Sequence, residues 1–216
     1  MVRLDIFADP ICPWCLIGKR LLDAALDARP DHPFEIVWQP FQLNPGMPRA
    51  GMDRRAYLEA KFGGQIEAAR AYVEIDDKAR AAGIEPNLAA ITRTPNTLDA
   101  QRLIHWAGLE GCQTALVQAL FDAYFLEGRD IGSPGVLAAI AGAVGMDRGV
   151  VARLLASDAD ADAIRARDAH ARARGVSGVP TFIVADRHVL VGAQPTALWE
   201  QVIAELAGDP AKARLQ

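Results

Sequence analysis

The sequence has few cysteines, few aromatic residues and no long apolar run. Its 216 residues include three cysteines, and aromatic residues make up 6% of the chain. So small and odd a cysteine count excludes a scaffold held together by disulfides. The longest uncharged apolar stretch, residues 135–146, is shorter than the roughly 20 residues that a membrane-spanning helix needs. We therefore expect neither a disulfide-rich secreted domain nor a membrane protein.

The sequence also lacks a basic segment. It has 23 Lys and Arg against 27 Asp and Glu, a net charge of -4, and no block of basic residues. A nucleic-acid-binding surface needs such a block or stripe, so nucleic acid is excluded as a default partner. The first seven residues, MVRLDIF, are too short and too charged for the apolar part of a secretory signal, and we expect a cytoplasmic protein.

The beginning of the chain predicts a strand, a helix and a second strand. Residues 2–8 carry apolar side chains at alternate positions and stop at Asp9-Pro10, as a strand entering a turn does. Residues 13–28 carry an apolar stripe at helical spacing, and residues 34–38 form the second β-rich run. A right-handed crossover makes these two strands parallel.

The end of the chain predicts a β-hairpin and a helix. Residues 181–185 and 188–191 are short β-rich runs separated by two turn residues. A helix begins near Pro195-Thr196 and ends at Gly208-Asp209-Pro210.

Between these two parts, residues 41–179 are rich in alanine and helical in period, with about five to seven helices. Thr94-Pro95 and Ser133-Pro134 are typical helix starts. Four glycines stand where helices end: Gly83, Gly111, Gly145 and Gly175. A crossover needs only a dozen or so residues, so most of this stretch is an inserted helical domain. We predict a discontinuous sheet domain of residues 1–45 and 160–216, and a helical domain of residues 46–159.

The sharpest motif is Cys12-Pro13-Trp14-Cys15, which follows a strand and opens a helix. Two residues between the cysteines bring the sulfurs within disulfide distance, and the helix N-terminus stabilises an anion on Cys12. We expect an exposed Cys12 as the nucleophile and a more shielded Cys15 that resolves the mixed disulfide. Pro13 makes the turn rigid, and Trp14 offers substrates a flat apolar contact.

Two other interpretations fit the cysteine pair less well. A structural zinc site needs four ligands, and the sequence has no second cysteine pair and only isolated histidines, so we expect no metal. Inert buried thiols have no need of a strand-to-helix junction, which redox chemistry uses.

A second motif, Gly178-Val179-Pro180-Thr181, precedes the third strand. A cis bond between Val179 and Pro180 would turn a backbone edge toward the cysteines, where an extended substrate peptide could pair with it. The dipeptide alone favours an ordinary trans proline that starts a strand.

Together these segments resemble the DsbA-like thiol-disulfide oxidoreductases of the thioredoxin superfamily, and within them the FrnE-like branch, over nearly the whole chain. The matching segments are residues 9–19, 40–45, 96–97, 123–125, 178–182 and 192–194. The resemblance implies an α/β thioredoxin fold with a large all-helical domain inserted between the second strand and the helix preceding a cis-proline, Pro180. It also implies a redox-active disulfide between Cys12 and Cys15 and no other cofactor.

The sequence departs from its relatives at two positions. Trp14 stands where DsbA has a histidine, so a cation that stabilises the neighbouring thiolate is missing and we expect a less oxidising protein. Gln101 replaces a histidine typical of FrnE-like sequences; His105 one turn later could substitute for it but is better explained as a packed or surface residue. The third cysteine, Cys112, follows Gly111 at a helix start; a structural role is favoured, although that position could lower its pKa.

Three functions follow. The first is exchange with protein or small-molecule disulfides and dithiols, with glutathione as a possible recycling thiol. The second is a glutathione-dependent isomerase or transferase resembling 2-hydroxychromene-2-carboxylate isomerase and the kappa-class transferases, which usually carry serine in place of Cys12. The third is a holdase or peptide-binding module that uses the groove between the sheet and helical domains without turnover. The chain could work as a monomer or a homodimer, and the sequence leaves open whether it oxidises, reduces or isomerises.

Overall fold

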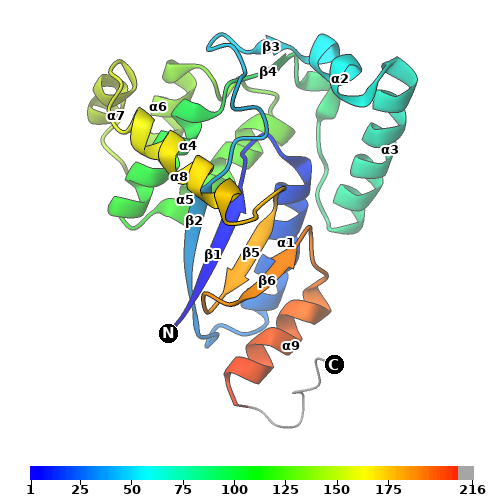
Figure 1. The fold of residues 1–216 in the computed structure, drawn as a ribbon, viewed down its shortest axis with the longest axis vertical. Coiled ribbons are helices and arrows are strands. Elements are labelled where there is room, and N and C mark those ends of the chain that lie inside the picture. Colours follow the sequence, from blue (N-terminus) through cyan, green and yellow to red (C-terminus); the bar gives the residue numbers. More distant parts are fainter. Residues whose placement is uncertain (209–216) are drawn as a thin grey trace.

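A computed structural model of the chain describes residues 1–208; the last residues of the predicted sheet domain, 209–216, lie outside that range. The main sheet has four strands in the order β2-β1-β5-β6 (Figure 1). Their bounds are Val2–Ala8 (β1), Phe34–Pro40 (β2), Thr181–Val184 (β5) and His188–Val191 (β6). β1 is parallel to β2 and antiparallel to β5, and β6 is antiparallel to β5, which confirms the predicted crossover and hairpin.

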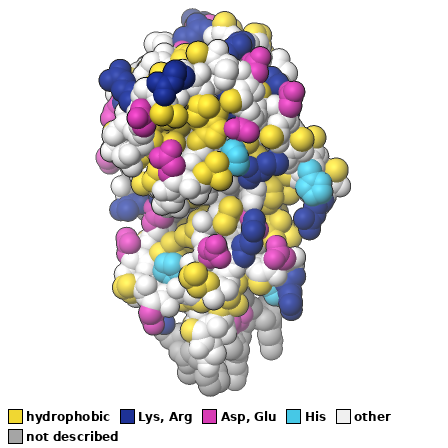
Figure 2. Space-filling view, turned by 90° about the vertical axis from the view of Figure 1, so that its left-hand side faces the viewer, with side chains coloured by type: hydrophobic (Ala, Val, Ile, Leu, Met, Phe, Trp, Pro, Cys, Tyr) yellow, Lys and Arg dark blue, Asp and Glu magenta, His cyan; other side chains and the backbone are white. Residues whose placement is uncertain are grey.

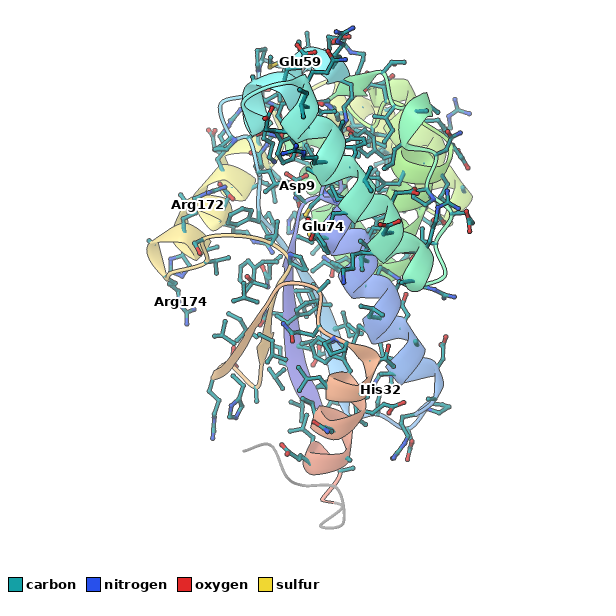
Figure 3. All side chains as sticks on the ribbon, turned by 90° about the vertical axis from the view of Figure 1, so that its right-hand side faces the viewer. Asp9, His32, Glu59, Glu74, Arg172 and Arg174 are labelled. Atoms are coloured by element: carbon teal, nitrogen blue, oxygen red, sulfur yellow. The ribbon has the colours of Figure 1, made fainter. Side chains whose placement is uncertain are left out.

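Helices cover the two faces of this sheet unequally. α1 (Pro13–Asp27) and α9 (Thr196–Leu206) pack together on one face, where Trp199 meets the Phe182 ring at 4.8 Å between centroids. α8 (Ala161–Ala173) lies on the opposite face against β2, as Figures 1 and 3 show. The apolar alternation of β1 explains the core face, because Leu4 and Ile6 are fully buried there.

The chain leaves the sheet after β2 and returns at α8 and β5, as predicted. The intervening elements are α2 (Arg54–Phe62), α3 (Gln65–Ala81), η1 (Leu88–Ala90), α4 (Leu98–Leu109), α5 (Gln113–Phe121), the π-helical turn η2 (Asp122–Leu126), α6 (Pro134–Ala143) and α7 (Arg148–Leu155). Two short strands, β3 (Met52–Asp53) and β4 (Arg93–Thr94), form an antiparallel ladder among these helices. The predicted domain boundaries at 45/46 and 159/160 stay predictions.

The helix-ending glycines are where the sequence predicts them, and one predicted helix start is wrong. All four glycines follow helices with a positive φ, which glycine adopts without steric penalty. Ser133-Pro134 starts α6, but Thr94-Pro95 does not start a helix: α4 begins at Leu98. Thr94 instead pairs with Met52 in the ladder and is fully buried.

The surface carries charges of both signs. On the face shown in Figure 2, basic and acidic side chains are interspersed and are not gathered by sign. Within residues 1–208, every helix is too short or too polar to cross a bilayer.

Candidate active site

The cysteine motif forms the first turn of α1. Cys12 is the N-cap residue and Pro13 follows it, where the missing N–H of a proline removes no helical hydrogen bond. The Cys15 N–H donates to the Cys12 carbonyl at 3.0 Å, and the Cys12 N–H donates to the Asp9 carbonyl at 2.9 Å. The structure contains no disulfide bond between Cys12 and Cys15. The strand-turn-helix context therefore holds the two thiols side by side at a helix N-terminus.

Burial is similar for the two thiols, and the expectation of an exposed Cys12 is wrong. Cys12 is 3% exposed and Cys15 is 1% exposed. The reason is that the Cys12 thiol faces the loop before β5 and donates to the Val179 carbonyl at 3.6 Å. Burial, and then interaction with Cys12, raises the pKa of the Cys15 thiol well above its usual range.

The loop that faces the cysteines contains a cis bond between Val179 and Pro180, the isomer that the resemblance implies. The Pro180 carbonyl accepts from the Gly192 N–H at 2.8 Å, which ties this loop to the end of β6. In residues 1–208 the Val179 N–H donates to no backbone or side-chain acceptor. A backbone edge with a free donor therefore lies directly beside Cys12.

Gly18 allows α1 to approach this loop. A β-carbon at position 18 would lie 3.1 Å from Pro180 Cγ and 3.4 Å from both Ala193 Cα and the Phe182 ring. Those distances leave no room for a methyl group without displacement of the loop. The glycine one turn after Cys15 thus sets the separation between the thiols and the cis-proline.

Asp9 is an ionisable group buried beneath the motif. Its side chain is fully buried and accepts from the Leu43 N–H at 2.7 Å, the Ile11 N–H at 3.2 Å and the Thr97 hydroxyl at 3.3 Å. Burial raises the pKa of Asp9 from 3.8 to about 6, although these donors oppose the shift. Figure 3 shows Asp9 at the N-terminal end of α1.

The Asp9 carboxyl also acts on Cys15. Its negative charge adds a small contribution to the raised pKa of the Cys15 thiol, whereas a hydrogen bond with the Asp9 backbone opposes the rise. Sequence reasoning treated Asp9 only as a turn residue and missed this role. The available signal was an acidic residue between an apolar strand and the motif, where the chain has little access to water.

Gln101 and Thr97 of the α4 segment hold the strand ends that carry the site. The Gln101 amide donates to the carbonyls of Ala8 at 2.8 Å and Phe41 at 3.1 Å. It is buried and joins the carboxyl ends of β1 and β2, so its contacts are structural. The amide thus ties the two strand ends together at a position where FrnE-like relatives have a histidine.

The remaining predicted residues are placed as follows. Trp14 is half-buried on the first turn of α1 and packs on the core. His105 lies 3.1 Å from Arg167 of α8, and both burial and that guanidinium lower its pKa. Cys112 occupies the N-cap position of α5, and burial raises its pKa, contrary to the lowering that a helix start could give. Within the described residues no group of three or more His, Cys, Asp or Glu side chains is arranged to hold a metal ion.

Comparison with known proteins identifies the fold and the family. Residues 3–204 match the family model of the DSBA-like thioredoxin domain. The structure of a probable DsbA oxidoreductase from Streptomyces coelicolor is similar with a TM-score of 0.84 and 29% identity, over 100% of this chain and 94% of that one.

Two more distant structures share the fold. A 2-hydroxychromene-2-carboxylate isomerase has a TM-score of 0.73 and 19% identity, over 98% of this chain and 99% of that one. The cytosolic disulfide reductase DsbM from Pseudomonas aeruginosa, solved with GSH, has a TM-score of 0.66 and 21% identity, over 95% and 99%. The match across 3–204, with a cysteine pair at the start of α1 facing a cis-proline, shows that the chain belongs to the DSBA-like thioredoxin domain family of disulfide oxidoreductases.

Proposed function

We propose that this protein exchanges disulfides through Cys12 and Cys15, with Cys12 as nucleophile and Cys15 as the resolving thiol. The observation that carries the proposal is the pair of adjacent thiols at the start of α1, with one of them in contact with the backbone edge at Val179. That arrangement supplies a nucleophile, a second thiol within reach and a place for the substrate chain.

The first step joins the substrate to Cys12. The Cys12 thiolate attacks one sulfur of a substrate disulfide, the substrate S–S bond breaks, and the departing sulfur leaves as a thiolate. The helix N-terminus stabilises the negative charge on Cys12 before attack.

The second step releases the substrate. Cys15 loses its proton and attacks Cys12 Sγ, so a Cys12–Cys15 disulfide forms and the second substrate thiolate leaves; the substrate gains two electrons and the protein loses two. Burial makes ionisation of Cys15 unfavourable, so a nearby base is needed. Asp9, with a pKa of about 6, is largely ionised at pH 7 and accepts that proton.

In this proposal the substrate contacts four residues: Val179, Pro180, Pro13 and Trp14. The free Val179 N–H pairs with an extended peptide beside the disulfide, in the manner of an added strand. Trp14, half-buried on the first turn of α1, contacts apolar parts of the substrate. The same site accepts small disulfides, which need less of the edge.

Glutathione is the proposed recycling thiol. Two glutathione molecules reduce the Cys12–Cys15 disulfide and leave as glutathione disulfide, which balances the two electrons. DsbM, which shares the fold, was solved with GSH and is a cytosolic reductase. With Trp14 in place of a cation beside Cys12, we propose a cytoplasmic, FrnE-like protein that is less oxidising than DsbA.

The reduction potential tests the proposal. The Cys112→Ser protein, which keeps only the proposed pair, is equilibrated in graded glutathione buffers, and alkylatable thiols are counted by intact mass. We expect both thiols to disappear in a single two-electron transition, at a midpoint more negative than about -120 mV. Thiols that alkylate in every buffer would contradict the redox pair.

A matched variant separates the two cysteines. Cys15→Ser should accumulate a mixed disulfide between Cys12 and substrate, because no second thiol resolves it. Cys12→Ser should form none. Equal trapping by the two variants would reject the assigned roles.

The alternative is a glutathione-dependent isomerase. It is favoured by the fold shared with 2-hydroxychromene-2-carboxylate isomerase and opposed by the cysteine at position 12. Tight glutathione binding by a Cys12→Ser, Cys15→Ser protein, with isomerisation of 2-hydroxychromene-2-carboxylate, would support it over disulfide exchange.

A further inference from the structure

A cavity of about 580 Å³ lies among α2, α3 and the η1 segment, apart from the cysteine motif. Its apolar lining is Leu58, Ala68, Ala69, Leu88 and Ile91. The volume lies within the range of small-molecule sites, and such sites combine apolar walls with a few polar groups. The polar group that distinguishes this cavity is the guanidinium of Arg54.

The guanidinium of Arg54 is buried and surrounded by tyrosine rings. The residue is 8% exposed, and its guanidinium lies 5.6 to 5.8 Å from the ring centroids of Tyr57, Tyr72 and Tyr124. Its Nε donates to the Tyr72 hydroxyl at 2.8 Å and its Nη1 to the Thr94 hydroxyl at 3.1 Å. Both acceptors are neutral, so the rings and hydroxyls solvate the charge without neutralising it.

No carboxylate of the described residues pairs with Arg54. The neighbouring acids are engaged elsewhere: Asp53 caps α2 by accepting from the Ala56 N–H at 3.0 Å, and Glu59 pairs with Arg55 at 2.8 Å. An unpaired buried charge is destabilising, which makes an external counter-ion favourable at this position.

One nitrogen of Arg54 remains available. In residues 1–208, Arg54 Nη2 donates to no protein acceptor. Among these residues one side-chain polar atom is both fully enclosed and without a partner, and it is Trp199 Nε1. Arg54 Nη2 is not among the fully enclosed atoms, so it keeps some access to solvent, and Arg54 lines the cavity. A single free donor edge on a monocation suits one carboxylate better than a phosphate dianion, which needs more donors.

We propose that this cavity binds a small monocarboxylate with an apolar body, its carboxylate on Arg54 Nη2 and its hydrocarbon against Leu58, Leu88 and Ile91. Nothing in the exchange of disulfides uses this site. It is a second binding site, formed by the inserted helices.

Decanoate, decan-1-ol and decylamine are the probes, titrated by calorimetry into the full-length protein below their micelle concentrations. Decanoate should bind, decanol should bind at least about tenfold more weakly because it lacks the charge, and decylamine should not bind. Equal affinity for decanoate and decanol would overturn the role of Arg54.

Two variants locate the site. Ala69→Trp fills the cavity from an exposed lining position and should reduce decanoate affinity at least about tenfold. Ala81→Trp is the matched control, because Ala81 is exposed on the same helix outside the cavity. This variant should leave the affinity for decanoate unchanged. Decanoate binding that survives Ala69→Trp would place the ligand elsewhere and reject the proposal.

Arg54→Gln tests the charge directly and should abolish the preference for decanoate over decanol. Circular dichroism shows whether this variant folds. If it does not fold, the alcohol comparison and the Ala69→Trp variant still decide the proposal.

Discussion

Two cysteines of this chain occupy the N-cap positions of helices, and their surroundings differ. Cys12 precedes α1, has a second thiol one turn later and faces the Val179 carbonyl. Cys112 precedes α5, is half-buried and has no further cysteine after it in the sequence. Burial and the charge of Glu110 raise the pKa of Cys112. A position at a helix start therefore does not by itself lower the pKa of a thiol.

What distinguishes the Cys12 region is the set of groups that the fold brings to it. The cis-proline loop lies against α1 because Gly18 has no side chain, and the buried Asp9 interacts with the Cys15 thiol. The Cys112 region has no equivalent of either feature. The comparison predicts that changes at the α1 site alter exchange chemistry and that the matching change at α5 does not.

The largest expected effect comes from the two matched serine variants. Cys12→Ser should reduce disulfide exchange to the uncatalysed background, because the attacking sulfur is lost. Cys112→Ser should keep activity within about twofold of the wild type. The measurement is reduction of a mixed peptide disulfide at pH 7. A large loss in Cys112→Ser would break the comparison.

Asp9→Asn should slow the resolving step by about a hundredfold at pH 7, because the amide cannot accept the Cys15 proton. In the wild type the rate of mixed-disulfide resolution should rise as pH passes through about 6, where Asp9 ionises. The variant should lack this rise. Asp5→Asn is the control: Asp5 lies in β1 and lines a different cavity, next to α8, so this variant should keep the wild-type pH profile.

Asp9 also predicts how stability depends on pH. Its pKa is higher in the folded protein, so between about pH 4 and pH 6 the folded state binds more protons than the unfolded state. The contribution of Asp9 to the free energy of unfolding is therefore complete below about pH 4. It should fall by about 3 kcal/mol as pH rises from about 4 to about 6. Urea unfolding across pH 4 to 7 measures it. The same slope in Asp9→Asn would assign it to other groups.

The smallest expected effect is on the reduction potential. Trp14→His places a cation beside the Cys12 thiolate and should shift the potential in the positive direction, by about 30 mV for each 1.4 kcal/mol by which it stabilises the reduced form. Equilibration in glutathione buffers measures it, with Trp14→Phe as the uncharged control. An equal shift in both variants would show that bulk, and not charge, is responsible.

The sequence predicted the parts of the fold whose signals are local. The alternation of residues 2–8, the stripe of residues 13–28 and the two-residue turn before 188–191 each correspond to an observed element. Thr94-Pro95 was misread because a cap-then-proline pair also fits a strand end. The conformation of Thr94 depends on its contacts with Met52 and Arg54, which are distant from it in the sequence.

For the site, the sequence by itself determined the cysteine spacing, the helix that begins at it and the proline before β5, because these depend on neighbouring residues. Only the tertiary structure decided that Val179 covers Cys12, that Asp9 lies beneath Cys15 and that Arg54 is buried without a carboxylate. Burial and the pairing of charges depend on which distant segments come together. No local sequence pattern predicts the burial or the charge pairing of these groups, because desolvation depends on the tertiary packing of the whole protein.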